Sequence, residues 1–227
     1  MTPTDQDTAK VAEELNLIDT VSEAQLQEIQ EYFEERQRNV NFDGIRQSVG
    51  QDMKMNKDIS VIWSLEEANE LRLGSPSEQA IFLIKWAQEE FYLLHSKLIK
   101  YLPTIETDLK DNVIRVAQKI QEEQEIRGLT QDGYRFMTDI LRARLVAFNI
   151  EDLKIKMQIF ESIPGVQIIK YKPKFQGVQM AQLRNVTINF IWSNSFICEL
   201  QIRLGDPPVL EEENHFLYEI ERCQNSF

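Results

Sequence analysis

The chain has 227 residues, of which 42% are hydrophobic and 27% charged, and its formal net charge is −12 at pH 7. This is the composition of a globular protein with a core, and it excludes a chain that is disordered throughout. An acidic chain without a basic stripe lacks the clustered Lys and Arg that duplex DNA and anionic membranes require, so we expect no nucleic-acid partner.

The N-terminal segment MTPTDQDTAK is polar and has the pattern of neither a secretion signal nor an Arg-rich transit peptide. The most apolar stretch carries Lys85, Glu89 and Glu90, which interrupt the run of roughly 20 apolar residues that a membrane span needs. The two cysteines, Cys198 and Cys223, do not have zinc-ligand spacing. We therefore expect an intracellular protein, cytoplasmic by default, with no membrane span.

The first half of the chain repeats its apolar residues at helical spacing, which predicts an α-helical region. One helix is expected over residues 6–16, and a second from Ser22, whose hydroxyl can cap it. Residues 41–60 contain two glycines and scattered polar residues, a pattern that predicts a linker. A short helix is expected to follow and to end at Gly74.

The clearest helix starts after Ser75 and runs toward residue 102, before Pro103. Its apolar positions are Ile81, Ile84, Ala87, Phe91, Leu94, Leu98 and Tyr101. At about 1.5 Å per residue this helix spans roughly 35 to 40 Å, which is long enough to reach a protein partner. A further helix is predicted over residues 105–125, with Gly128 ending it.

From Asp139 onward the pattern changes to short strand-like runs and one amphipathic helix. The order is strand (DILRARLVAF), helix (EDLKIKMQIFESI) and three strands (VQIIKYK, NVTINFIW and FICELQIRL), with a closing helix over residues 212–223. The first β-α-β unit predicts a parallel pair of strands.

The fold class that follows is α+β, a mixed sheet of about four to five strands with flanking helices, preceded by an α-helical N-terminal region. We divide the chain into N-terminal helices and linker at residues 1–60, a long-helix region at 61–128 and the α+β domain at 129–227.

Two carboxylates lie in strands that are otherwise apolar or basic, Asp139 and Glu199. A carboxylate beside a core costs desolvation energy unless a cation compensates it. If the two strands are neighbours, both side chains can converge on one Mg²⁺, with substrate phosphates completing an octahedral shell of oxygens.

Basic and amide residues surround these two acids, several of them at alternate strand positions and therefore on one face. They are Arg142, Arg144, Lys170, Lys172, Lys174, Arg184, Gln201 and Arg203. Phosphate binding requires such a cationic lining. Cross-strand ion pairs on a solvent face are the alternative, and spacing alone favours them.

These segments resemble the synthetase domain of the RelA/SpoT family over residues 139–222. The resemblance is carried by D-I-L-R-A-R-L-V, K-Y-K-P-K-F with a following glycine, E-L-Q-I-R and N-H-F-L-Y-E-I-E-R. It implies a nucleotidyltransferase-like fold with Asp139 and Glu199 as the catalytic, Mg²⁺-binding acids. It implies contacts to guanine nucleotide or ATP from the following residues: Arg142, Arg144, Lys172, Lys174, Gln201, Arg203 and His215.

The chain departs from the family at two nucleotide-binding motifs. The R-x-K-x-x-x-S pattern is not found ahead of Asp139, and Val178 follows Gly177 where the family has a base-stacking tyrosine. We therefore expect a non-catalytic descendant, kept as a nucleotide sensor or a structural subunit that meets a protein partner through its N-terminal helices. The alternatives are a Mg²⁺-dependent pyrophosphotransferase making guanosine tetra- or pentaphosphate-like nucleotides, and a chance likeness of strand patterns.

Overall fold

The computed structural model describes residues 21–41, 74–130, 133–175, 184–192 and 196–205. Its elements in chain order are α2 (Glu23–Arg38), α5 (Pro76–Tyr101), β1 (Glu106–Leu109), α6 (Val113–Arg127), the 3-10 helix η1 (Gly133–Phe136), β2 (Leu141–Ala147), α7 (Ile150–Glu161), β3 (Val166–Lys174), β4 (Asn185–Trp192) and β5 (Phe196–Leu204). They make an α+β fold with a mixed five-stranded sheet, as the sequence predicts.

Four predicted elements lie, apart from residue 41, outside the described residues. They are the helices over residues 6–16 and 212–223, the linker over residues 41–60 and the short helix ahead of Gly74.

Side-chain caps begin the two N-terminal helices at the predicted serines. The Ser22 hydroxyl accepts a hydrogen bond from the backbone N–H of Gln25, whose side chain accepts one from the Ser22 N–H in return. Ser75 and Glu78 form the same reciprocal pair at the start of α5. Each pair satisfies N–H groups that the first helical turn leaves without partners, which is why the helices start at these residues.

The long helix α5 buries one face and exposes the other. Its buried stripe includes Ile84, Ala87 and Leu98, as helical spacing predicts, and also Ala80. Ile81 and Tyr101, predicted to face inward, are 54% and 39% exposed. Ile81 lies one residue past Ala80, about 100° around the helix, and so leaves the buried stripe. No helix in the described part of the chain is both long and apolar enough to cross a membrane.

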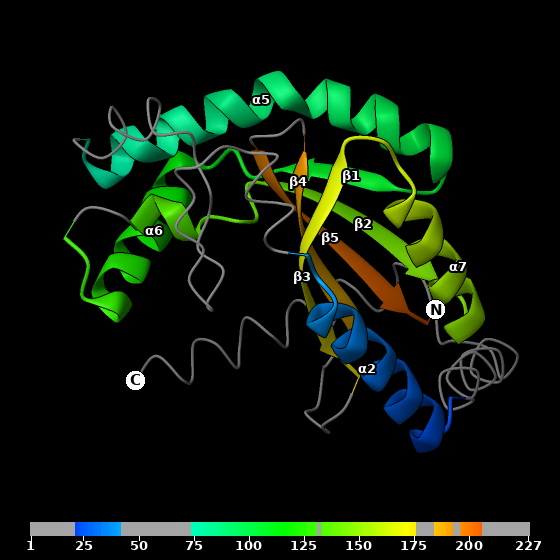
Figure 1. The fold of residues 1–227 in the computed structure, drawn as a ribbon. Helices are drawn as coiled ribbons and strands as arrows, with labels where there is room; N and C mark the ends of the chain where they lie inside the picture. Colours follow the sequence, from blue (N-terminus) through cyan, green and yellow to red (C-terminus); the bar gives the residue numbers. More distant parts are fainter. Residues whose placement is uncertain (1–20, 42–73, 131–132, 176–183, 193–195, 206–227) are drawn as a thin grey trace, which may run out of the picture.

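The sheet has the strand order β1-β2-β5-β4-β3 (Figure 1). Only β2 and β5 pair in parallel, and the other neighbours are antiparallel. The predicted parallel pair between β2 and β3 is therefore wrong. The strands β3, β4 and β5 pair antiparallel in succession, which brings β5 rather than β3 beside β2.

Strand β1 corrects the prediction of one helix over residues 105–125. Residues 106–109 pair antiparallel with β2, and the helix α6 begins only at Val113. The Asn112 side chain caps α6 by accepting from the N–H of Arg115 at 3.1 Å, and Gly128 ends the helix in the left-handed conformation as predicted. The sheet thus gains an edge strand from the chain segment that precedes Asp139.

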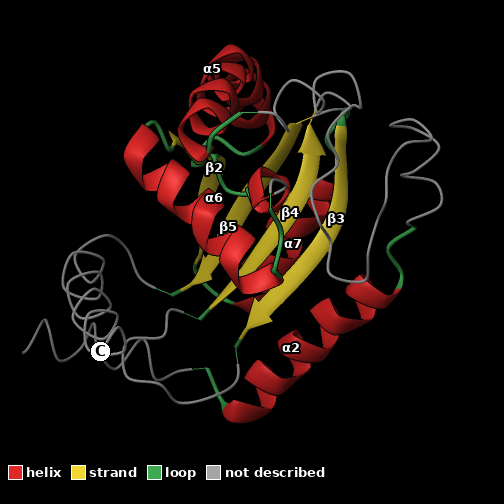
Figure 2. Ribbon diagram, turned by 90° about the vertical axis from the view of Figure 1, so that its left-hand side faces the viewer, coloured by secondary structure: helices red, strands yellow, loops and turns green. Residues whose placement is uncertain are grey.

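Two helices lie on opposite sides of the sheet. Figure 2 shows α6 in front of the strands and α7 behind them, with α5 above and α2 along the β3 edge. The apolar face of the sheet packs on α7, where the rings of Phe160 and Phe190 meet edge to face with centroids 5.0 Å apart. The face that carries polar side chains is turned to the side of α6.

Candidate functional site

The side of the sheet away from α7 carries polar residues on all five strands. Alternate residues of a strand point to the same side, and the strand register aligns them in rows across the sheet. This polar face consists of Glu106 and Asp108 on β1, Arg142 and Arg144 on β2, Glu199, Gln201 and Arg203 on β5, Asn185, Thr187 and Asn189 on β4, and Lys170, Lys172 and Lys174 on β3.

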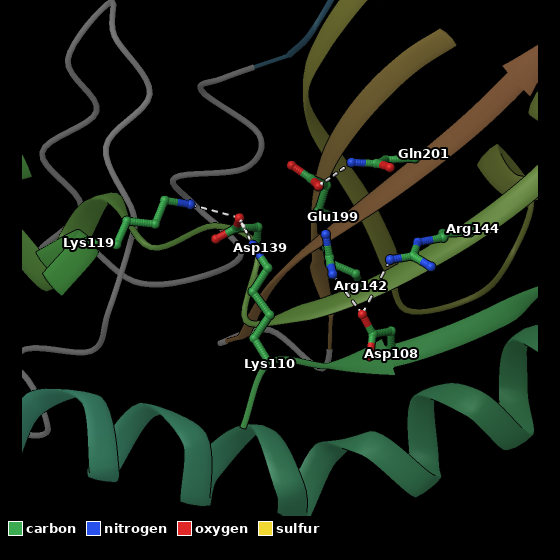
Figure 3. A network of polar contacts seen from close by, with 8 residues as sticks. All are labelled: Asp108, Lys110, Lys119, Asp139, Arg142, Arg144, Glu199 and Gln201. Carbon is green, nitrogen blue, oxygen red and sulfur yellow. Dashed lines mark hydrogen bonds and ion pairs between the residues drawn. The ribbon is translucent and has the colours of Figure 1, made fainter. Parts of the chain in front are cut away.

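Asp139 lies between η1 and β2, and two lysines contact it (Figure 3). One carboxylate oxygen, Oδ2, accepts from Lys119 Nζ of α6 at 2.7 Å and also from Lys110 Nζ, directly after β1. Asp139 is 8% exposed. Its other oxygen, Oδ1, is buried and has no hydrogen-bond partner among the residues that the structure describes. Lysines from two separate parts of the chain, the end of β1 and the helix α6, thus converge on one buried carboxylate.

The two lysines decide the charge state of Asp139. Burial by itself raises the pKa of this carboxyl group, but the charges and hydrogen bonds of Lys119 and Lys110 outweigh it and lower the pKa from 3.8 to about 2. The pKa of Lys110 is also lowered, because burial and the charges of Lys119 and Arg142 outweigh its attraction to Asp139. Because both ammonium groups contact the same carboxylate oxygen, Asp139 is ionised and holds the two cations together.

We expect this cluster to add a step to the pH dependence of stability. The pKa of Asp139 is lower in the folded state than in the unfolded chain, so its stabilisation is complete above pH 3.8 and is lost as the pH falls through about 2. The step amounts to about 2 kcal/mol. Denaturant unfolding from pH 5 to pH 2 measures it.

The matched variant for this measurement is Asp139→Asn, which does not titrate. Its free energy of unfolding is expected to change less than that of the wild type over the same pH range. Equal pH dependences in the two proteins would contradict an ionised, paired Asp139.

Glu199 lies on the central strand β5, beside Arg142 on one side and Asn189 on the other. It is 8% exposed, and its Oε1 accepts a hydrogen bond from the Gln201 amide at 2.9 Å. Lys172 is close enough to interact electrostatically with both Glu199 and Asp139. The pKa of Lys172 is nevertheless lowered, first by burial and then by Lys170. Each buried carboxylate therefore has cations around it.

Arg142 and Arg144 meet a carboxylate of the edge strand β1. Arg142 Nη2 lies 2.7 Å and Arg144 Nη2 lies 3.5 Å from Asp108 Oδ2 (Figure 3). These are the cross-strand ion pairs that spacing alone favours. Arg203 lies near them, and its pKa is lowered by burial and then by the charges of Arg144 and Arg142.

In this arrangement, two lysines occupy one of the Asp139 carboxylate oxygens that a divalent metal ion would use. Mg²⁺ is usually held by one or two carboxylates together with waters and phosphate oxygens, so Asp139 and Glu199 are the residue types that such a site uses. Mg²⁺ requires near-octahedral oxygen ligands, whereas the Oδ2 atom of Asp139 is already bound by two ammonium groups that would repel the ion. We therefore derive no reaction step through Mg²⁺.

Most of the residues singled out in the sequence lie together. The structure places Asp139 at one end of the polar face and places on the face itself the following residues: Arg142, Arg144, Lys172, Lys174, Glu199, Gln201 and Arg203. His215 lies outside the described residues. Their roles in binding or catalysis stay predictions.

Sequence reasoning missed Asp108, Lys110 and Lys119, which form ion pairs with the predicted residues Arg142, Arg144 and Asp139. Asp108 was assigned to a helix, although the alternation of Thr107 and Leu109 with acids is a weak strand signal. Lys110 and Lys119 carry no local signal for contact with Asp139, because the contact is made only when β1 and α6 pack beside η1.

No protein-family model and no curated protein matches this chain. The chain is similar to small alarmone synthetases of known structure. Synthetase 1 from Bacillus subtilis, bound to its product pppGpp, has 14% identity and a TM-score of 0.40 over 71% of this chain and 81% of its own. Synthetase 2 from the same organism has 15% identity and a TM-score of 0.43 over 71% and 83%. A GTP pyrophosphokinase family protein from Streptococcus pneumoniae has 18% identity and a TM-score of 0.41 over 72% and 78%.

Proposed function

We propose that this chain is a RelA/SpoT-like domain that binds a phosphate-rich nucleotide on its polar face without transferring pyrophosphate. It then acts as a nucleotide sensor or as a structural subunit of a larger assembly. The observation that supports this most is the crowding of cations. Lys170 and Lys172 are alternate residues on one side of β3, and Arg203 shares the polar face with Arg144 and Arg142. Burial and then the like charges of these neighbours lower the pKa of Lys172 and of Arg203. Such groups gain most when a multiply charged anion lies among them.

The cations are spread along the strands. Arg142 of β2 lies opposite Glu199 of β5, and Arg203 lies four residues further along β5. At the usual rise per residue, this is a distance of roughly 13 Å along the strands. Lys172 and Lys174 follow β3 over the neighbouring rows. A row of positive charge of this length suits a polyphosphate chain better than a single phosphate group.

Three observations favour binding without transfer. The family's ATP-holding pattern is not found ahead of Asp139, and Val178 stands where a tyrosine would stack on the base. In addition, the Oδ2 atom of Asp139 is held by Lys110 and Lys119, so the carboxylate that the resemblance assigns to a metal ion is engaged by side chains of the chain itself.

A role as an assembly subunit is supported by the exposed side of α5. Tyr92 is 76% and Leu93 is 60% exposed, and these neighbouring apolar side chains offer a contact area to a protein partner.

Mg²⁺-dependent pyrophosphotransfer is the second candidate, and a different observation favours it. Both acids, Asp139 and Glu199, are present and buried, and Oδ1 of Asp139 has no partner in the described part of the chain. Incubation with ATP, GTP and Mg²⁺ tests it by chromatography. Release of AMP together with a pyrophosphorylated guanosine nucleotide, both lost in Asp139→Asn, would replace the non-catalytic proposal.

We expect calorimetric titration to detect binding of GTP by the wild-type chain and a loss of affinity when a polar-face cation is removed. Arg144→Gln and Lys172→Gln are each expected to weaken binding about 10-fold or more, because a hydrogen bond to a charged group contributes about 1.5 to 3 kcal/mol. Parallel titrations with ATP and with GDP show how far the affinity depends on the base and on the number of phosphates.

The matched control is Lys100→Gln, which removes the same charge from an exposed position of α5. It is expected to leave the affinity within about twofold of wild type, because Lys100 is exposed on a helix outside the polar face and salt screens the charges of exposed side chains. The proposal fails if folded wild-type protein binds none of the nucleotides, or if Lys100→Gln weakens binding as much as Arg144→Gln.

A further inference from the structure

The backbone of each lysine that contacts Asp139 is held in position by the surrounding secondary structure. Lys110 follows β1, and its backbone N–H donates to the carbonyl of Ile140 at 2.8 Å, directly beside Asp139. Lys119 belongs to α6, next to the buried residue Ile120, which packs near η1. The lysine backbones are therefore held by the sheet and by helix packing.

Together, the two ammonium groups at Asp139 carry a charge of +2, the same as a divalent metal ion. Lys110 and Lys119 both bind Oδ2 of Asp139, so this oxygen has two positive charges in direct contact. A divalent cation at the same oxygen would have to displace both lysines or approach two like charges at contact distance. Displacing Lys110 or Lys119 would also leave a partly buried ammonium group without a counterion, which is costly.

Glu199, the other buried acid, does not restore a metal site. Its register neighbour is Arg142, and its Oε1 is engaged by Gln201. Lys172 on β3 is also near enough to interact electrostatically with both Glu199 and Asp139. Positive charge at this end of the polar face is thus supplied by side chains.

We propose that Lys110 and Lys119 take the place of a divalent cation at Asp139, so that the polar face binds its polyphosphate ligand without a metal ion. The part that concerns the ligand rests on the function proposed above. The part that concerns the metal rests only on the geometry of the Asp139 cluster, and the two are tested separately.

Titration with Mn²⁺ as a probe, followed by the electron paramagnetic resonance of the free ion, tests the metal part on the full chain. Wild type and Asp139→Asn are expected to have the same Mn²⁺ affinity. The double variant Lys110→Gln/Lys119→Gln is expected to gain one site, at least 10-fold tighter than any in wild type, and to lose it when Asp139→Asn is added.

Two results would overturn the metal part of the proposal. One is a wild-type Mn²⁺ site that disappears in Asp139→Asn. The other is a Lys110→Gln/Lys119→Gln protein that unfolds cooperatively, as wild type does, and yet gains no site. Should the double variant not fold, Lys119→Gln alone is used and is expected to gain a weaker site that Asp139→Asn again removes.

The ligand part is tested with inorganic tripolyphosphate and GTP, titrated in EDTA and in excess Mg²⁺. Affinity in EDTA is expected to equal or exceed that in Mg²⁺, because Mg²⁺ competes with the protein for the phosphate oxygens. Binding that needs Mg²⁺ would overturn the inference. Lack of binding in both buffers would refute the proposed function, and the Mn²⁺ titration would still decide what the lysines do at Asp139.

Discussion

Replacing Phe33 with alanine is expected to lower the free energy of unfolding by about 3 to 5 kcal/mol. Phe33 of α2 is fully buried, and its ring centroid lies 5.9 Å from that of Tyr171 and 6.0 Å from that of Phe175. Truncation removes this aromatic contact and leaves a cavity between α2 and the end of β3. Chemical denaturation monitored by circular dichroism measures the change.

The helix α2 also completes the edge of the sheet, which adds to the effect. The side-chain oxygen of Gln37 accepts from the Tyr171 N–H at 2.6 Å, and that of Gln30 accepts from the Phe175 N–H at 3.3 Å. These contacts satisfy edge N–H groups on the strand that carries Lys172. Detachment of α2 is therefore expected to loosen one border of the polar face as well.

Phe148→Ala is the matched control, because Phe148 is 76% exposed and the substitution is the same. It is expected to change the free energy of unfolding by no more than about 0.5 kcal/mol. If Phe33→Ala and Phe148→Ala had equally small effects, α2 would not be docked on β3 as described.

Replacing Gly133 with alanine is expected to cost about 3 kcal/mol, for the opposite reason, overpacking. A Cβ at Gly133 would lie 2.5 Å from Cγ of Gln124 and closer still to the backbone oxygen of Ile120. The backbone of α6 cannot move away without shifting the helix, so η1 and α6 would separate. Thermal unfolding followed by calorimetry measures the loss.

This substitution also tests how Asp139 is positioned. The contact of η1 with α6 holds Lys119 near Asp139, so the acid-dependent stability step of Asp139 is expected to shrink in Gly133→Ala. The control is Gly128→Ala, where an added Cβ meets nothing within 4 Å but the residue has a φ of 62°. That strain costs about 1 to 2 kcal/mol and should leave the Asp139 step unchanged. A Gly133→Ala protein as stable as Gly128→Ala would contradict the described packing.

Local signals in the sequence were sufficient for most of the elements that the structure describes. Ser22 and Ser75 begin helices through their own side chains, and Gly128 ends one because it adopts the left-handed conformation. The alternation of apolar and polar residues located β2, β3, β4 and β5 and their polar sides. Strand β1 was missed, because a four-residue edge strand depends on pairing with β2 more than on its own sequence.

The sequence by itself determined the class of fold, the elements from β2 to β5 and the residue types of the polar face, because helix caps and side-chain periodicity act over a few residues. Only the tertiary structure decided that β5 lies between β2 and β4, that Asp108 pairs with Arg142, and that Lys110 and Lys119 converge on Asp139. These contacts join residues 20 or more positions apart, such as Lys119 and Asp139. They arise from the packing of whole elements. This packing brings Lys110 and Lys119 to the Asp139 oxygen where a metal ion would otherwise bind.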